Sequence, residues 1–236
     1  MKKHPTILAF DTSGPHCAAA LLLGGEIVAS RHEDMSRGQA ERLFPLLDLV
    51  MSEVGTVWEE LDAIAVGIGP GNFTGIRISI SAARGLALAL GVPAIGVTGF
   101  DVVRRLLNGE DGKTVTLLPG PKGQQYYQIA TNGKVQNTGI AAAAEFVCHS
   151  YLDAPALISI ADPLPDIEVY KIGETGIDCD APGVELPGLP EKIAPTIAKV
   201  AATRLASGQN NPRPAPLYIR PADAAPSREP SIKILP

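Results

Sequence analysis

The chain has 236 residues, of which 45% are hydrophobic, 19% charged and only 5% aromatic, and its formal net charge is −5. This length accommodates one large domain or two small lobes, with a core built mainly from Ala, Val, Ile and Leu. Lys and Arg never cluster beyond two neighbours. This pattern argues against strong nucleic-acid binding by the chain alone, because phosphate contacts need clustered cations.

The three cysteines, Cys17, Cys148 and Cys179, are odd in number, widely spaced and outside any CxxC motif. They predict reduced thiols rather than a disulfide framework or a zinc site. The first apolar run stops at Asp11, which is too short for a signal-peptide core or a membrane span. We therefore expect a soluble, cytoplasmic protein that does not contact a membrane.

The first hundred residues predict strands and helices in a clear order. Gly24-Gly25 is a two-residue hairpin signal, and apolar residues recur at helical spacing over 39–53. Ile76, Ile78 and Ile80 alternate as in a strand, but the longer stripe to Leu90 fits a helix better. The expected order is strands at 6–10, 17–23 and 26–32, a helix at 39–53, a strand at 63–68, a helix at 76–90 and a strand at 94–97. Such an order predicts a mixed sheet covered by helices.

The pattern weakens after about residue 112. Strands are expected at 115–118 and 125–131, around Pro119-Gly120-Pro121, followed by a short helix at 141–151. Residues 162–190 are rich in Pro, Gly and Asp and predict a loop, whereas 195–206 predict a helix. Seven prolines from Pro212 onward predict an extended tail lying on the surface.

The segment from Gly67 to Arg77 reads Gly-Ile-Gly-Pro-Gly-Asn-Phe-Thr-Gly-Ile-Arg and joins an expected strand to an expected helix. Glycines permit a tight turn there, and the helix that follows starts with free N–H groups and a partial positive charge. The turn is therefore either an anion site or a rigid corner where another chain packs closely.

Three segments resemble the TsaB (YeaZ) family. They are Ile7 to Ser13 (Ile-Leu-Ala-Phe-Asp-Thr-Ser), the glycine turn together with Gly85-Leu86-Ala87 and Gly91, and the tail Pro216 to Ala224 with Ile234-Leu235. The likeness is dense over 6–100, thin over 110–210, and returns at 214–224. It implies an α/β, actin-like fold of two lobes, with mixed sheets flanked by helices and a reduced second lobe. The implied boundaries are 1–105 for the first lobe, 106–212 for the second and 213–236 for an extended tail.

The resemblance also implies a function without chemistry of its own. Members of the family are partner subunits of the TsaD transferase, which forms N6-threonylcarbamoyladenosine in tRNA. The implied partners are a TsaD-type transferase, an ATPase of the TsaE type and, when the chain is alone, a second copy; tRNA is contacted only through the complex. No cofactor is expected in the isolated chain, and an adenine nucleotide is left open at an interface of the complex.

Kinases of the actin-like fold hold Mg²⁺ and phosphates between two opposed carboxylates. Asp11 stands at the first of these positions, but the hairpin that should carry the second reads Pro119-Gly120-Pro121-Lys122. The resemblance therefore implies a vestigial nucleotide site at best, formed by Asp11, Thr12, Ser13, Gly69, Gly71, Thr74, Gly173 and Gly176. The alternative is a minimal kinase or ATPase that uses Asp11 and Thr12.

No residues of this sequence match a protease or metal centre. The TsaD metal-binding HxxxH pair is replaced by the segment from Arg37 to Leu43, which holds no histidine, and Glu41 alone is a poor transition-metal ligand. A glycoprotease function, the third alternative, has no Ser/His/Asp or Cys/His set to support it.

The two long helices are the expected interface with the partner. The helix over 76–90 is apolar nearly all round, so it should be buried on more than one side. The expected interface residues are Leu43, Leu46, Leu47, Val50, Ile76, Arg77, Ile80, Ala83 and Ala87, although the same apolar stripes also fit a core. Arg77 is expected either to pair with a carboxylate across the interface or to form a local salt bridge near Asp11 or Glu41.

Overall fold

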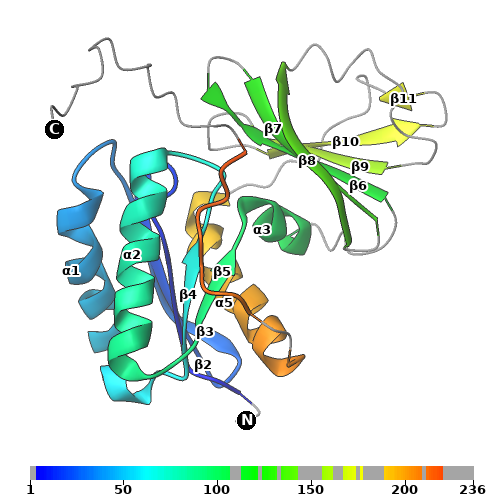
Figure 1. Ribbon diagram of the computed structural model, residues 1–236. Coiled ribbons are helices and arrows are strands. Elements are labelled where there is room, and N and C mark those ends of the chain that lie inside the picture. Colours follow the sequence, from blue (N-terminus) through cyan, green and yellow to red (C-terminus); the bar gives the residue numbers. More distant parts are fainter. Residues whose placement is uncertain are drawn as a thin grey trace, which may run out of the picture.

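The computed structural model describes residues 4–106, 113–121, 124–131, 134–142, 156–161, 167–173, 176–177, 189–208 and 211–219. Two β-sheets and their flanking helices make up the molecule (Figure 1). The first sheet has five strands in the order β3-β2-β1-β4-β5, and the second has six in the order β11-β10-β9-β6-β7-β8.

The five-stranded sheet combines an antiparallel meander with two parallel strands. β1 (Ile7–Asp11), β2 (His16–Leu23) and β3 (Glu26–Asp34) are antiparallel neighbours. β4 (Ala63–Gly67) pairs in parallel with β1, and β5 (Ala94–Val97) pairs in parallel with β4. The predicted strands in this part are confirmed, and their order is that of an actin-like lobe.

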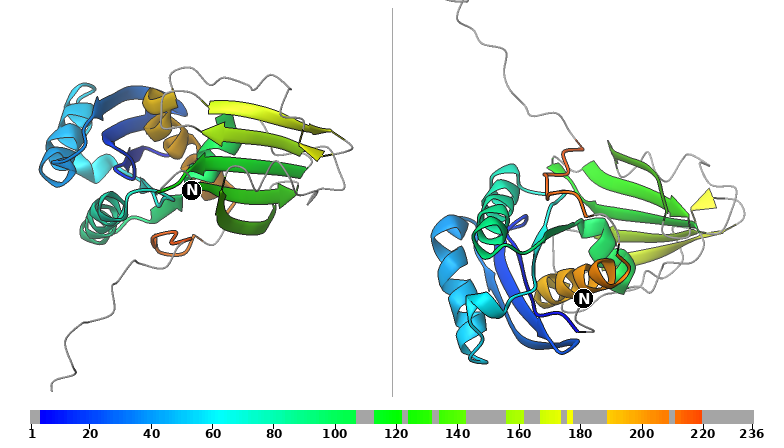
Figure 2. Two further views of the ribbon diagram at one scale, coloured as in Figure 1. Left: turned by 90° about the horizontal axis from the view of Figure 1, so that it is seen from above. Right: turned by 60° about the horizontal axis from the view of Figure 1, so that its bottom comes forward.

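Helices cover both faces of this sheet, as the two views of Figure 2 show. α1 (Gln39–Ser52) and α2 (Phe73–Leu90) pack on one face, where Leu8 and Phe10 point into the core. α3 (Gly99–Leu106) and α5 (Leu189–Ala206) pack on the other face, where Ile7 and Ala9 point. The alternation of β1 side chains between the two cores explains why every residue of this strand is buried.

The six-stranded sheet forms the second lobe. Its strands are β6 (Lys113–Pro119), β7 (Gln124–Thr131), β8 (Lys134–Ala142), β9 (Ala156–Ala161), β10 (Ile167–Gly173) and β11 (Gly176–Ile177). The predicted pair at 115–118 and 125–131 is confirmed as β6 and β7, which are antiparallel neighbours. β6 also pairs in parallel with β9, so the sheet extends on both sides of this hairpin.

Three predictions for the second half of the chain need correction. The predicted loop at 162–190 is wrong in part, because β10 and β11 lie within it. The predicted helix at 141–151 begins inside β8, and the remainder of it lies outside the described residues. Helix α5, placed by the expected boundaries in the second lobe, packs on β1 and β2 of the first lobe. Ile197, Ala198 and Ala201 supply the apolar face that holds it there.

The segment 211–219 runs from the end of α5 past β5 towards the start of α2 (orange to red in Figure 1). It contains no helix or strand and is held by contacts with the first lobe. Leu217 N–H donates to the Ile68 carbonyl at 2.9 Å, and Pro214 is buried beside Gly96. The described part of the tail therefore packs along the first lobe without forming a helix or strand.

Candidate functional site

The glycine turn between β4 and α2 packs directly on the turn that follows β1. A Cβ atom at Gly75 would lie 1.9 Å from the Thr12 carbonyl oxygen, and one at Gly71 would lie 2.3 Å from that of Ser13. Two hydrogen bonds hold the two turns together. Asn72 N–H donates to the Ser13 carbonyl at 2.7 Å, and Thr12 Oγ1 donates to the Gly75 carbonyl at 2.7 Å. Only glycine at both positions permits such close backbone packing.

The helix start behind this turn has few donors to offer an anion. The Asn72 side chain caps α2, and its Oδ1 accepts from Thr74 N–H at 2.9 Å and Gly75 N–H at 3.1 Å. The next amide, of Ile76, donates to the Asn72 carbonyl at 2.9 Å. The contacts favour a rigid corner over an anion site, because the cap already satisfies these N–H groups. The segment that packs on the corner is the turn after β1 of the same chain, not a second chain as predicted.

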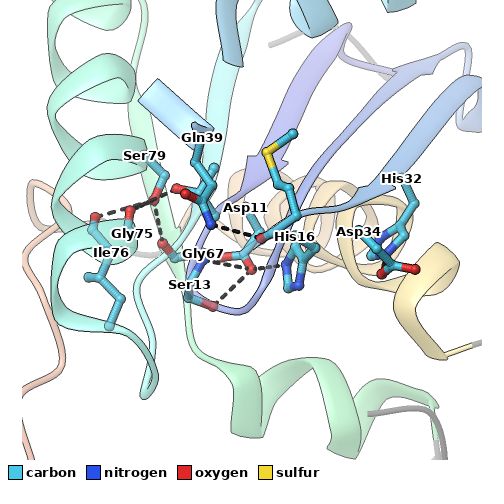
Figure 3. A network of polar contacts seen from close by, with 12 residues as sticks. Asp11, Ser13, His16, His32, Asp34, Gln39, Gly67, Gly75, Ile76 and Ser79 are labelled. Atoms are coloured by element: carbon cyan, nitrogen blue, oxygen red, sulfur yellow. Dashed lines mark hydrogen bonds and ion pairs between the residues drawn. The ribbon is translucent and has the colours of Figure 1, made fainter. Parts of the chain in front are cut away.

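Asp11 ends β1 and is almost fully buried beneath this corner (Figure 3). Its Oδ2 accepts from Ser13 N–H at 3.2 Å, from Ser13 Oγ at 2.8 Å and lies 2.7 Å from His16 Nε2. Gly67 makes room for it, since a Cβ there would lie 1.8 Å from Asp11 Oδ1. Burial opposes ionisation, but the hydrogen bond and electrostatic attraction of His16, together with the Ser13 donors, outweigh it and hold the pKa of Asp11 below its ordinary value of 3.8.

His16 is the residue that sequence reasoning missed. It lies at the start of β2, five residues after Asp11, and the tight connection between antiparallel strands brings the two together. Its ring also lies 5.2 Å from that of His32, which contacts Asp34 at 3.0 Å. The short turn between the two predicted strands, which places His16 five residues after Asp11, is the signal that indicates such a pair.

A cavity of about 540 Å³ lies beside Asp11, between the first lobe and the β6–β7 hairpin. Ser13, His16 and the glycine turn border it on one side, and Leu118, Gly120 and Tyr126 on the other. Most of the remaining lining side chains are aliphatic, from α3, α5 and β5. The arrangement joins a small polar end at Asp11 to a larger apolar end.

The described residues that line this cavity include no Lys, no Arg and no second carboxylate, the groups that hold nucleotide phosphates and their metal ion. Asp11 is the one carboxylate among them. The second lobe contributes Gly120 and Pro121 where an opposed carboxylate would stand, and the Gly120 N–H already donates to the Gln124 carbonyl at 2.8 Å. A lone buried carboxylate repels phosphate rather than coordinating Mg²⁺ against it.

The expected vestigial site is only partly assembled. Asp11, Ser13, Gly69 and Gly71 line the cavity, whereas Thr12 is buried in the corner and Thr74 faces the opposite side of α2. Gly173 and Gly176 are paired across β10 and β11. Glu174 and Thr175 between them lie outside the described residues.

The aliphatic residues predicted to meet a partner lie on the inner faces of α1 and α2, which pack on the sheet. Every aliphatic member is buried in the core that α1 and α2 form with the sheet. Leu46, Leu47, Val50 and Ala83 have no exposed surface at all, so none can meet a partner in the folded chain. The members that the structure assigns to the core are Leu43, Leu46, Leu47, Val50, Ile76, Ile80, Ala83 and Ala87.

The outward faces of the same two helices form a groove instead. It lies between the first halves of α1 and α2, and Leu43 is the buried member of its lining. Phe44 is 46% exposed on one wall, and Ile78 and Ala82 are half-buried on the other. We call this the α1–α2 groove; it is lined by Ala40, Leu43, Phe44, Thr74, Arg77, Ile78, Ser81 and Ala82.

Arg77 makes neither of the two predicted local salt bridges. Its Nε–H donates to the hydroxyl of Tyr218 at 2.9 Å, and its guanidinium carbon lies 3.7 Å from the centre of the Phe73 ring. The Phe73 and Tyr218 rings stack with their centres 4.8 Å apart. Arg77 thus joins the start of α2 to the C-terminal segment, 141 residues further along the chain.

The described residues offer little further chemistry. Burial, together with the charges of Glu33 and Asp11, raises the pKa of Cys17 to about 12, so this thiol is inert. Cys148 and Cys179 lie outside the described residues. No three His, Cys, Asp or Glu side chains of the described part lie close enough together to hold a metal ion.

The chain is similar to proteins whose names refer to threonylcarbamoyladenosine in tRNA. Residues 25–156 match the family model TsaD, described as tRNA N6-adenosine threonylcarbamoyltransferase. Over 132 residues, the chain is 40% identical to the tRNA threonylcarbamoyladenosine biosynthesis protein TsaB of Escherichia coli, a match that covers 54% of this chain and 57% of that protein.

Two solved structures from Pseudomonas aeruginosa are similar as well. One, described as similar to peptidase YEAZ, aligns with a TM-score of 0.65 at 23% identity and covers 92% of this chain and 100% of its own. The other, YeaZ, aligns with a TM-score of 0.53 at 28% identity over 64% of this chain and 72% of its own. With the family model matching more than half of its length, the chain belongs to the TsaD-like tRNA N6-adenosine threonylcarbamoyltransferase family and, within it, to the TsaB (YeaZ) group.

Proposed function

We propose that this chain is an accessory, non-catalytic subunit in the formation of N6-threonylcarbamoyladenosine in tRNA. It binds a TsaD-type transferase through the α1–α2 groove and supports the chemistry of that partner. The name of the E. coli relative and the matching family model support the pathway. The observation that carries the docking role is the exposed apolar surface of the two helices.

Helix α2 has more apolar surface than its own fold buries. Its composition would suit a membrane span of the same length, yet only 33% of its residues are buried. The buried residues face the sheet, so the rest of the apolar surface is left on the outer side. A second helix pair could cover that side, and interfaces of this type bury roughly 1,200–2,000 Å² in total.

The shape of the α1–α2 groove suits helices of a partner protein. Phe44 supplies a large apolar side chain, which is the type that dominates binding energy at interfaces. Ala40, Ser81 and Ala82 are small and permit close approach of a second backbone. The same face is expected to form a homodimer when the transferase is absent.

The cavity beside Asp11 supports the non-catalytic part of the proposal. Phosphoryl transfer needs groups that hold metal and neutralise phosphate charge, and the described lining offers neither. We therefore place any adenine nucleotide at an interface of the assembled complex, where a TsaE-type ATPase would join. Contact with tRNA is then made through the complex, in the cytoplasm.

Reconstitution tests this function. The transferase, the TsaE-type ATPase, tRNA and threonylcarbamoyl adenylate are combined with and without this chain, and modified adenosine is measured by nucleoside mass spectrometry. Modification that requires the wild-type chain, and that is equally supported by Asp11→Asn, is the expected result. Modification that proceeds without the chain would contradict the proposal.

A minimal actin-like kinase or ATPase is the second candidate. The observation that favours it is the ionised carboxylate of Asp11 on the wall of a cavity of nucleotide size. It predicts Mg²⁺-dependent ATP turnover by the isolated chain that is lost in Asp11→Ala. The accessory role predicts no turnover by either protein, and a coupled ADP-release assay on the purified chain separates the two.

A further inference from the structure

The C-terminal segment does more than cover the surface, because it orients a cation at the edge of the α1–α2 groove. Arg77 lines that groove and is exposed. Its Nε–H is taken by the Tyr218 hydroxyl, and its planar group lies against the Phe73 ring. The guanidinium is therefore held on one edge and one face by residues from two distant parts of the chain.

Among the described residues, the opposite edge of the guanidinium has no charged partner. A guanidinium has five N–H donors, and the contact with Tyr218 uses one of them. No carboxylate of the described residues forms an ion pair with Arg77, whereas Arg42, Arg104 and Arg204 each have one. A guanidinium group that is already oriented loses little conformational entropy when it binds a carboxylate through two hydrogen bonds.

The C-terminal segment is itself held in place, and this restricts the orientation of the Arg77 guanidinium. Leu217 N–H bonds to the Ile68 carbonyl at the end of β4, one residue before Tyr218. Pro214 is buried beside Gly96, and the neighbouring Arg204 donates to the Gly96 carbonyl at 2.6 Å. Tyr218 thus reaches Arg77 from a segment fixed to the ends of β4 and β5.

We propose that Arg77, positioned by Tyr218 and Phe73, binds a carboxylate side chain of the transferase that docks in the α1–α2 groove. The proposal rests on the proposed function and adds a charged anchor to its apolar surface. A protein carboxylate fits better than an RNA phosphate, because the groove beside Arg77 is apolar and the chain carries a net charge of −5. The C-terminal segment thereby becomes part of the docking surface.

The test is calorimetric titration of the full-length chain with the TsaD-type transferase at low and at high salt. Arg77→Gln is expected to weaken binding about tenfold at low salt and to reduce the salt dependence of the affinity. Tyr218→Phe keeps the ring stack but removes the acceptor hydroxyl, and we expect about threefold weaker binding. Arg105→Gln is the matched control, because Arg105 is exposed on α3, on the other side of the sheet.

The outcomes separate this proposal from the function on which it rests. If Ser81→Glu abolishes binding while Arg77→Gln binds as the wild type does, the docking surface stands and the anchoring role of Arg77 is refuted. If neither variant weakens binding, the docking surface itself is wrong. If Arg77→Gln weakens only the binding of tRNA to the assembled complex, the anion is an RNA phosphate and the carboxylate assignment is overturned.

Discussion

Asp11 and His16 form a buried pair at the end of the first strand, with Oδ2 of the carboxylate 2.7 Å from Nε2 of the imidazole. The pair ties β1 to β2 beneath the glycine turn and faces the cavity between the lobes. Here Oδ2 makes its hydrogen bonds within the chain, whereas Oδ1 is buried without a hydrogen-bond partner among the described residues.

The stability of the protein should depend on the ionisation of Asp11. Its folded-state pKa is depressed relative to the unfolded value near 3.8. The resulting stabilisation is complete above about pH 4 and is lost as the pH falls through the lower folded-state pKa. We expect Asp11→Asn to lower the free energy of unfolding by about 2 kcal/mol at pH 7, because it removes a charged acceptor from His16 and Ser13.

Urea unfolding followed by circular dichroism over pH 2 to about pH 7 measures this linkage. The difference between wild type and Asp11→Asn should shrink as the pH falls below 3.8, because the unfolded state then takes up a proton that the folded state binds less readily. A difference that stays constant with pH would show that the charge of Asp11 contributes nothing.

Two glycines of α2 should respond oppositely to alanine. Gly75→Ala places a methyl group 1.9 Å from the Thr12 carbonyl, so the corner must open, and we expect a loss of about 3 kcal/mol. Gly85→Ala, on the same helix, meets nothing within 4 Å and should gain up to about 1 kcal/mol through better helix propensity. Denaturant unfolding of both variants checks the contrast, and equal effects would refute the close packing of the corner.

Neighbouring residues on α2 separate the core from the docking surface. Ile80 is 3% exposed, and Ile80→Glu should destabilise the fold by several kcal/mol by burying an unpaired charge. Ser81 is exposed in the α1–α2 groove, so Ser81→Glu should leave the unfolding midpoint nearly unchanged. Thermal unfolding distinguishes the two, and a stable Ile80→Glu would mean that α2 faces the other way.

Asp101 should be a stabilising residue at the start of α3. It accepts from Thr98 N–H and Oγ1, and its Oδ2 lies 2.8 Å from Arg204 of α5. These partners outweigh burial and hold its pKa below the ordinary value. Asp101→Ala should cost about 3 kcal/mol in urea unfolding, whereas Asp48→Ala, at an exposed site on α1, should cost almost nothing.

The first lobe was predictable because its signals are local. β1 to β5, α1 and α2 each have a clear apolar period or a glycine boundary, such as Gly91 after α2. Helix α3 is the exception, because eight residues directly after a strand give too little periodicity. The Thr98-x-x-Asp101 capping pair is the signal that indicates it.

The second lobe was harder because its strands carry little alternation. β9, β10 and β11 lie in a stretch broken by Pro, Gly and Asp, and they gain their order from pairing with β6 and with each other. The position of α5 on the first sheet is equally non-local, since its partners in β1 lie about 190 residues earlier. Sequence periodicity gives no information about such pairings.

In the candidate site, too, local sequence patterns identify helix faces but not the contacts between distant segments. The apolar stripe of Leu43, Leu46, Leu47 and Val50 correctly identifies one face of α1, but periodicity does not state what covers that face. The sheet covers it, and the docking surface falls on the residues between, such as Phe44. The contact of Arg77 with Tyr218 joins two segments that no local pattern connects.

The mass of the complex in solution tests the central claim most directly. Size-exclusion chromatography with light scattering on this chain mixed with its TsaD-type transferase should give a 1:1 complex with the wild type. With Ser81→Glu, it should give two separate proteins, while circular dichroism shows that the variant is folded. A folded Ser81→Glu variant that still forms the complex, or a wild-type chain that forms none, would contradict docking through the α1–α2 groove.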